Sequence, residues 1–318
     1  MSVEVTIVIP AFNESESISE LIRRILVTLN KIGINKNYEI LYVNDGSSDN
    51  TSSILEKLNA PFLKEIKLSQ NTGKSIALMA GFFHASGKYI VTIDADLQDR
   101  PEDIPKLLNQ LNKGFDLVTG WRIKREDKVI RKIGSRIYNR FLQRITGLEI
   151  HDQNCGLKIY KKNVIDKLIL YGHLHRFILY QASLLGFKVS EVPVGNDRRK
   201  FGYSKYKTFR YKAFFDFISL FFTYRYAMTP LHFFGLISLI IFIPGFLIIL
   251  WLLIEHIGYL FNLGNFTQLV DRPLLFIGIA LILSGISTFM TGLICDFVLF
   301  QHTRINMTKT LNNFIEKN

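Results

Sequence analysis

The sequence predicts an α/β protein with a mostly parallel sheet, followed by two hydrophobic segments long enough to span a membrane. Over roughly the first 120 residues, short apolar runs alternate with segments of helical spacing. Strands that alternate with helices usually form parallel sheets with helices on both faces. Residues 231–254 and 273–295 contain no Asp, Glu, Lys or Arg over 24 and 23 positions, enough for two membrane-spanning helices.

The elements of the sheet follow in order along the chain. Segment 16–32 has apolar residues at the spacing of one helix face, and the polar cluster 45–49 is a turn and helix-start signal. Applying the same criteria, we expect strands at 5–10, 38–44, 62–68, 89–93 and 116–119. We expect helices at 16–32, 54–58, 73–85 and 101–111.

Polar residues follow three of the expected strands: Asn13 and Glu14, then Asp45, then Asp94 and Asp96. In parallel sheets, ligands bind beyond the carboxyl ends of the strands, so these side chains should gather at one rim. Paired carboxylates where a buried strand ends are suited to holding a divalent cation against a diphosphate. The alternative for Asp94 and Asp96 is a solvated acidic turn.

Composition indicates a membrane protein with anionic partners. Apolar residues make up 48% of the chain, with 26 Phe and a mean hydropathy of +0.18. The whole formal charge of +12 lies in residues 1–226, which hold 35 Lys+Arg against 23 Asp+Glu. This excess favours anionic lipid headgroups or phosphate substrates, and no nucleic-acid motif is evident. Cys155 and Cys295 lie far apart, so a disulfide framework is not expected.

The carboxyl-terminal part predicts a transmembrane hairpin within residues 229–318, with spans at about 231–254 and 273–298 and a short cytoplasmic tail. Buried core helices are the alternative. Residues 207–228 combine Phe and Tyr with Lys and Arg, which predicts juxtamembrane amphipathic helices or a core helix of the globular domain. Basic residues flank the hairpin, so we expect the large domain and both termini on the cytoplasmic side of the cell inner (plasma) membrane.

Five motifs together resemble glycosyltransferase family 2, and most of all its polyprenyl-phosphate branch, the dolichol-phosphate mannose synthase and bacterial undecaprenyl-phosphate glucosyltransferase group. The resemblance covers nearly the whole chain. The motifs are Val-Ile-Pro-Ala-Phe-Asn-Glu at 8–14, Val-Asn-Asp-Gly-Ser-Ser-Asp at 43–49, Asp-Ala-Asp-Leu-Gln-Asp at 94–99, Asp-Gln-Asn-Cys-Gly-Leu-Lys at 152–158, and Arg-Lys-Phe-Gly-Tyr-Ser-Lys-Tyr at 199–206. The resemblance implies a Rossmann-like GT-A catalytic domain over residues 1–206.

The resemblance also implies the donor and metal residues. The nucleotide-sugar donor would be bound by Pro10, Ala11, Asn13, Glu14, Asp45, Asp94, Ala95 and Asp96. Asp94, Asp96 and Gln98 would hold Mg²⁺ or Mn²⁺, because alternation along an extended segment turns all three side chains the same way. A helix N-cap is the alternative role for Asp45, and we expect Asp99 to cap the helix after Pro101.

Four residues are implied as catalytic: Asp94, Asp96, Asp152 and Arg122, the last of these near the donor phosphates. Asp152 would orient the acceptor or sugar or act as a weak base, or it would be a structural partner for Lys158 or Arg122. The acceptor phosphate would meet Arg131, Arg199, Ser204 and Lys205. A phosphate acceptor is already largely ionised near pH 7 (second pKa about 6), so no general base is needed and we expect inverting, single-displacement transfer.

These features predict transfer of one sugar to polyprenyl (undecaprenyl) phosphate, with UDP-glucose as the favoured donor. GDP-mannose, UDP-N-acetylglucosamine and UDP-aminoarabinose stay open as donors, as do diacylglycerol or a glycan as acceptor and a non-catalytic membrane scaffold. Gly73-Lys74-Ser75 is not a P-loop, because Leu68 stands where its first glycine should be. Small residues at Gly278, Ser284, Gly285 and Gly292 predict a possible homo-oligomer.

Overall fold

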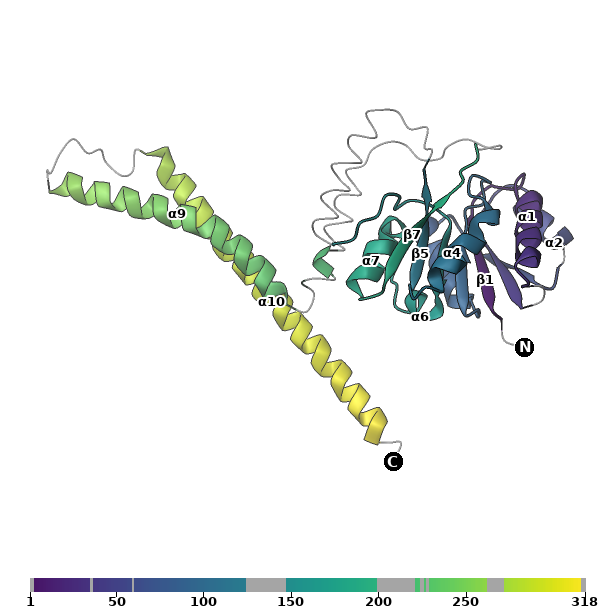
Figure 1. Ribbon diagram of the computed structural model, residues 1–318. Helices are drawn as coiled ribbons and strands as arrows, with labels where there is room; N and C mark the ends of the chain where they lie inside the picture. The colour runs from purple at the N-terminus through teal and green to yellow at the C-terminus, as the bar shows by residue number, and fades with distance from the viewer. Residues whose placement is uncertain are drawn as a thin grey trace. The chain divides into compact units, whose positions relative to one another are not determined.

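The computed structural model describes residues 3–34, 37–58, 60–123, 147–198, 221–223, 226, 229–261 and 272–315. The chain divides into two compact units, Met1–Leu220 and Phe221–Asn318 (Figure 1). The first unit holds the sheet, and the second holds two long helices, so we describe each by itself.

A seven-stranded sheet, ordered β3-β2-β1-β4-β6-β5-β7, forms the first unit. Its strands are β1 (Val5–Ala11), β2 (Tyr38–Asn44), β3 (Leu63–Lys67), β4 (Tyr89–Thr92), β5 (Leu117–Arg122), β6 (Lys158–Lys161) and β7 (Val189–Val194). Neighbouring strands run parallel except on both sides of β6, which pairs antiparallel with β4 and β5. The predicted mostly parallel sheet is confirmed, and the five predicted strands lie within a few residues of β1 to β5.

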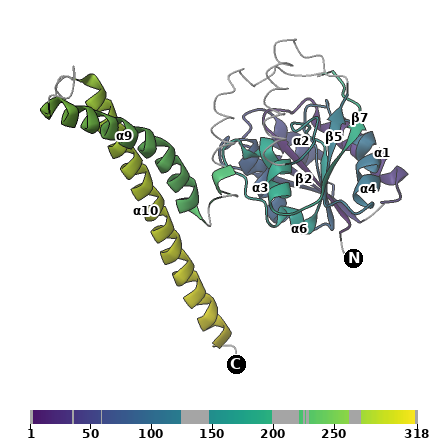
Figure 2. The same ribbon diagram turned by 60° about the vertical axis from the view of Figure 1, so that its left-hand side comes forward.

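Helices cover both faces of this sheet (Figures 1 and 2). They are α1 (Ile18–Lys31), α2 (Thr51–Leu58), α3 (Lys74–His84), η1 (Pro101–Asp103), α4 (Ile104–Leu111), α6 (Lys162–Ile165), η2 (Leu174–Phe177) and α7 (Ile178–Leu184). Ile7 and Ile9 of β1 pack in one core with α1 and α4, whereas Val8 points to the other face and contacts Gly81 of α3. Full burial of each such aliphatic side chain contributes about 1.5–3 kcal/mol.

The second unit is a hairpin of α9 (Pro230–Leu260) and α10 (Pro273–Ile315), which lie side by side (Figure 2). The segments Pro230–Leu260 and Pro273–Gln301 have the length and composition of membrane-spanning helices, and an 18-residue stretch of each has a mean hydropathy of 2.9 and 2.1, respectively. Helix α9 runs through Pro244 without interruption. The two predicted apolar helices are therefore present, with α10 extending well past residue 298.

Glycines on one stripe of α10 bring the two helices together. A Cβ at Gly285 would lie 2.8 Å from Cβ of Phe242, and one at Gly292 would lie 2.8 Å from Cβ of Phe234. Gly278 contacts α9 in the same way, and Ser238 of α9 donates a hydrogen bond to the Gly285 carbonyl at 2.9 Å. Three of the four small residues predicted to join copies of the chain thus pack inside the hairpin, and of the four only Ser284 is exposed.

Candidate active site

The loops after β1 and β2 meet at the carboxyl edge of the sheet. Pro10 and Ala11 are buried as the last residues of β1, where they pair with Val43 and Asn44 of β2. Asn13 has a left-handed backbone (φ 52°), and its side-chain oxygen accepts a hydrogen bond from the Ser48 N–H at 2.8 Å. Asn13 thus joins these two loops and fixes the position of Glu14 beside it.

Asp45 is buried and anchors the start of α3. Its Oδ1 accepts hydrogen bonds from the Thr72 N–H and hydroxyl, both at 2.8 Å, and its Oδ2 accepts from the Gly73 N–H at 2.8 Å. Asp45 is therefore not the cap of the following helix α2. That role falls to Asp49, whose Oδ1 accepts from the Thr51 N–H at 3.1 Å.

Asp94, Asp96 and Gln98 follow β4 and are all partly exposed, whereas Ala95 and Leu97 between them are buried. The predicted alternation of exposed and buried side chains is present, but the segment is a turn and not an extended strand. Leu97 has a positive φ of 60°, and the Gln98 N–H donates to Asp96 Oδ1 at 3.1 Å. The three oxygen-bearing side chains are therefore the exposed ones in this turn.

A lysine lies directly against the first of these carboxylates. Lys74, at the start of α3, places its Nζ 2.5 Å from Asp94 Oδ1. Burial raises the pKa of Asp94, but Lys74, helped by Lys158 and Arg122, outweighs this effect and holds that pKa below its ordinary value. Asp94 is thus kept ionised next to a positive charge.

The side-chain oxygens of Asp94, Asp96 and Gln98 fit Mg²⁺ or Mn²⁺. These ions prefer carboxylate and amide oxygens and retain positions for phosphate or water. Gly156 leaves room beside the Asp94 carboxylate, because a Cβ at position 156 would lie 2.5 Å from Cγ of Asp94. Among the residues that the structure describes, no three His, Cys, Asp or Glu side chains form a group that could hold a metal by themselves. Two carboxylates and an amide would therefore share the ion with a ligand's phosphates.

Asp99 belongs to the same cluster and does not cap a helix, so that expectation was wrong. Arg100 precedes η1, and the buried Asp99 carboxylate instead contacts Gly156 and accepts from Cys155 Sγ at 3.7 Å. Burial, together with the charges of Asp94 and Asp96, raises the pKa of Asp99 to about 6. Three carboxylates therefore lie within electrostatic range of one another.

Arg122, the last residue of β5, forms a two-point ion pair with Asp152. Nε lies 2.6 Å from Oδ2 and Nη2 lies 3.0 Å from Oδ1, and the two side chains are 13% and 3% exposed. Burial lowers the pKa of Arg122, but the bonds to Asp152 raise it further than burial lowers it. This ion pair is the structural partnership with Arg122 that the sequence left open for Asp152, and the role of Asp152 toward the acceptor or sugar stays a prediction.

Three residues at this site were missed by sequence reasoning. Lys74 was considered only as part of a failed P-loop match. Lys158 is buried and donates from Nζ to the Cys155 carbonyl, and burial is the main cause that lowers its pKa. His175 in η2 lies with Nδ1 2.9 Å from Ser75 Oγ on α3, and burial lowers the pKa of this histidine to about 3. Lys158 closes the motif at 152–158 and was considered only as a partner of Asp152. No local motif marks His175, because tertiary packing brings it to the site.

The four residues predicted to meet the acceptor phosphate lie outside the described residues: Arg131, Arg199, Ser204 and Lys205. The same holds for most of the predicted juxtamembrane segment 207–228. The described chain reaches Arg198, immediately before the first residue of that basic stretch.

Comparisons with known proteins agree with this fold. The family model described as "Glycosyl transferase family 2" matches residues 6–169. A dodecaprenyl-phosphate galacturonate synthase of Rhizobium johnstonii is 34% identical over 305 residues, covering 93% of this chain and 88% of that protein. Glucosyl-3-phosphoglycerate synthase of Mycobacterium tuberculosis with uridine diphosphate is 18% identical, with a TM-score of 0.52 over 70% of this chain and 79% of that chain. The same enzyme with Mn²⁺, UDP-glucose and phosphoglyceric acid has a TM-score of 0.50 at 18% identity, over 63% and 72% of the two chains.

Proposed function

Because this chain belongs to glycosyl transferase family 2, we propose that it transfers one sugar from a nucleotide sugar to the phosphate of a polyprenyl phosphate. The observation that carries the proposal is the turn after β4, where Asp94, Asp96 and Gln98 are the exposed residues and Lys74 lies against Asp94. The curated relative supports the acceptor, since its name specifies a polyprenyl phosphate and it aligns with 93% of this chain.

Asp94, Asp96 and Gln98 would hold Mg²⁺ or Mn²⁺, which when bound supplies charge stabilisation to the leaving nucleoside diphosphate. The Mn²⁺ and UDP-glucose in the mycobacterial enzyme support a divalent ion for this fold. Lys74 would add a second positive charge at the same oxygen cluster, and Pro10, Ala11, Asn13, Glu14, Asp45 and Ala95 would line the donor side of the site. Lys74 begins α3, and the other residues lie at the carboxyl ends of β1, β2 and β4 or shortly after them.

The acceptor would attack the sugar carbon directly, with inversion. A phosphate monoester is largely ionised near pH 7 (second pKa about 6), so it needs no base to deprotonate it. The ion pair with Arg122 agrees with this scheme, because it occupies both oxygens of Asp152 and leaves this carboxylate poorly placed to act as a base. Arg131, Arg199, Ser204 and Lys205 are the proposed contacts of the acceptor phosphate.

Two sugar donors have specific support, and the other donors named from the sequence stay open. UDP-glucose is the donor that the sequence favours, and it is the donor held by the structural relative. A galacturonate donor is the second candidate, because galacturonate is the sugar named for the 34% identical relative. With α9 and α10 in the inner membrane and both termini in the cytoplasm, either donor would reach the site from the cytoplasmic side.

The test is transfer of radiolabelled sugar from each donor into extracted polyprenyl phosphate by the detergent-solubilised full chain with Mn²⁺ or Mg²⁺. We expect a lipid-linked product with the wild type that releases its sugar in mild acid, and none with Asp96→Ala. A parallel assay supplies diacylglycerol, and a product that forms there and resists mild acid would indicate a diacylglycerol acceptor. Equal behaviour of the two proteins, or no product with any donor, would refute the proposal.

A further inference from the structure

The chain that leaves β7 is fastened to the loop that follows β4. The Asp197 N–H donates to the Gln98 carbonyl at 2.9 Å, and Asp99 and Asn196 form an isolated antiparallel bridge. One residue earlier in the chain, the Gly195 N–H donates to Asp103 Oδ2 at 2.8 Å. The sheet pairing of β7 ends at Val194, so these contacts act on residues beyond the sheet.

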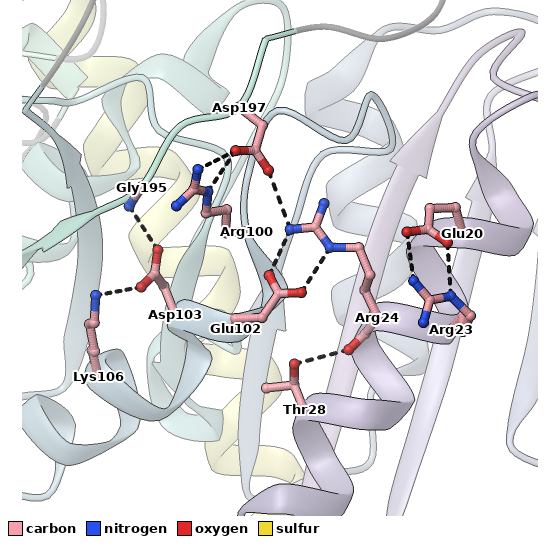
Figure 3. Close-up of polar contacts among 10 residues, drawn as sticks. All are labelled: Glu20, Arg23, Arg24, Thr28, Arg100, Glu102, Asp103, Lys106, Gly195 and Asp197. Atoms are coloured by element: carbon pink, nitrogen blue, oxygen red, sulfur yellow. Dashed lines mark hydrogen bonds and ion pairs between the residues drawn. The ribbon is translucent and has the colours of Figure 1, made fainter.

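Side chains reinforce this connection (Figure 3). Asp197 accepts a hydrogen bond from Arg100 Nε at 2.7 Å on one oxygen and lies 3.4 Å from Arg24 Nη2 on the other. Arg24, which projects from α1, also binds Glu102 at two points, 2.9 and 2.7 Å. Asp197 is thus held by two guanidinium groups that come from different elements.

The geometry around Gly195 shows how closely the two segments approach. A Cβ at Gly195 would lie 2.6 Å from Cδ of Arg100 and 2.7 Å from its Nη1. The Arg100 side chain therefore lies directly over the Gly195 backbone before it reaches Asp197. The Arg24 and Asp197 side chains are 13% and 25% exposed, whereas those of Arg100 and Glu102 are each 47% exposed. The contact between Arg24 and Asp197 is therefore the more buried part of this network, and exposed ion pairs contribute less to stability.

The two segments joined in this way carry different parts of the proposed site. Gln98 is a proposed metal ligand and sits beside Asp96 in the turn after β4. The proposed acceptor-phosphate stretch begins at Arg199, two residues after Asp197. A contact at Asp197 consequently fixes the point from which the acceptor stretch starts, relative to the donor's metal.

We propose that Asp197, held by Arg100 and Arg24, is a positioning residue that fixes the end of the segment after β7, from which the proposed acceptor-phosphate residues continue, against the metal-binding turn. This inference rests on the function proposed above. It predicts that loss of the Asp197 contacts weakens use of the lipid phosphate and leaves the nucleotide sugar unaffected. Transfer is sensitive to such placement, because an error of about 1 Å can cost about 10²-fold in rate.

The experiment compares steady-state constants of the full chain in detergent for Asp197→Asn, Asp197→Glu and Arg100→Gln. For Asp197→Asn and Arg100→Gln we expect the KM for polyprenyl phosphate to rise by about tenfold or more, with the KM for the nucleotide sugar within about twofold of wild type. Asp197→Glu keeps the charge and should recover most of the loss. Melting temperatures identify any variant that fails to fold.

Arg23→Gln is the matched control. Arg23 precedes Arg24 on α1 and pairs with Glu20 at 2.8 Å, but it is 64% exposed and does not reach Asp197 (Figure 3). We expect wild-type constants for this variant, which separates the positioning role from loss of any ion pair on α1.

The outcomes distinguish the two proposals. If the wild type makes product but the Asp197 and Arg100 variants keep the wild-type KM for the lipid, or lose donor and acceptor affinity equally, the positioning role is refuted and the proposed function stands. The positioning role is also refuted, and the proposed function also stands, if Asp197→Glu raises the KM for the lipid as much as Asp197→Asn does. Absence of lipid-linked product with the wild type would refute the proposed function, and the positioning role with it.

Discussion

Lys74 places its ammonium nitrogen 2.5 Å from Oδ1 of Asp94, at the edge of the sheet where the nucleotide-sugar donor is proposed to bind. A positive charge here lowers the pKa of Asp94 against the opposing effect of burial. The same contact explains why a carboxylate at the end of a buried strand stays ionised before any metal arrives.

Removing this charge should change the pH dependence of metal binding. In Lys74→Met, burial would dominate and the pKa of Asp94 would rise, so Asp94 would become protonated at a higher pH than in the wild type. Because a metal binds the ionised carboxylate, we expect the acid limb of Mn²⁺ binding to move to higher pH. Titration of bound Mn²⁺ against pH measures this shift, and Lys67→Met on β3 is the control. If the acid limb of Mn²⁺ binding stays at the same pH in Lys74→Met, or moves to lower pH, the role given to Lys74 is contradicted.

Asp99 predicts a pH dependence of stability. Its pKa is about 6 in the folded protein against an ordinary value of 3.8, so the folded state holds this proton more tightly than the unfolded state. The stabilisation is complete below about pH 4 and is lost as pH rises through about 6. With chelator present, Asp99→Asn should therefore melt above the wild type at pH 8 and at the same temperature at pH 4.

Asp116 supplies a control of opposite sign. Its carboxylate accepts from Lys161 Nζ at 2.8 Å and from the Lys188 N–H at 2.9 Å. Burial raises its pKa, but these contacts lower it further, so Asp116→Asn should melt below the wild type at pH 8. If Asp99→Asn, like Asp116→Asn, melts below the wild type at pH 8, the ionised Asp99 does not destabilise the folded protein and this prediction is wrong.

The buried pair of Arg122 and Asp152 predicts a large stability effect. Asp152→Asn leaves the Arg122 guanidinium buried without its charge partner, which should cost about 3–5 kcal/mol in the free energy of unfolding. The double variant Arg122→Met with Asp152→Leu should recover most of that stability. Denaturant unfolding of the three proteins checks this, and a single variant as stable as the wild type would show that the pair is not a structural unit.

Gly156 predicts how tightly the carboxylates are packed. A Cβ at this position would lie 2.5 Å from Cγ of Asp94 and would also contact Asp99. Gly156→Ala should therefore lower the free energy of unfolding by about 1–3 kcal/mol and weaken transfer. Gly235→Ala is the control, because its Cβ would meet no atom within 4 Å. A Gly156→Ala protein with wild-type stability and activity would show that this space is not needed.

The sequence predicted the elements that have strong periodicity. β1 and β2 are continuous apolar runs followed by polar turns, and α1 has a regular apolar face, so all three were placed within two residues. β6 and β7 were missed. β6 has only four residues and carries Lys158 and Lys161, and β7 contains Glu191 and Pro193, so neither shows an apolar run or strict alternation.

The candidate site was predicted where residues act within one loop. The exposure pattern of Asp94, Asp96 and Gln98 follows from their spacing, whereas the partners of Lys74, Asp99 and Asp152 depend on distant segments. Asp152 meets Arg122 across 30 positions, and Asp197 meets Arg24 across 173. Such pairings depend on strand order, which local spacing does not encode.

Binding of Mn²⁺, followed by electron paramagnetic resonance with and without UDP, tests the central claim most directly. We expect the wild type to bind one Mn²⁺ more tightly when UDP is present, and Asp96→Ala to lose both the binding and its dependence on UDP. Mn²⁺ binding in Asp96→Ala that equals the wild type, with the same response to UDP, would contradict a metal and diphosphate site at the turn after β4.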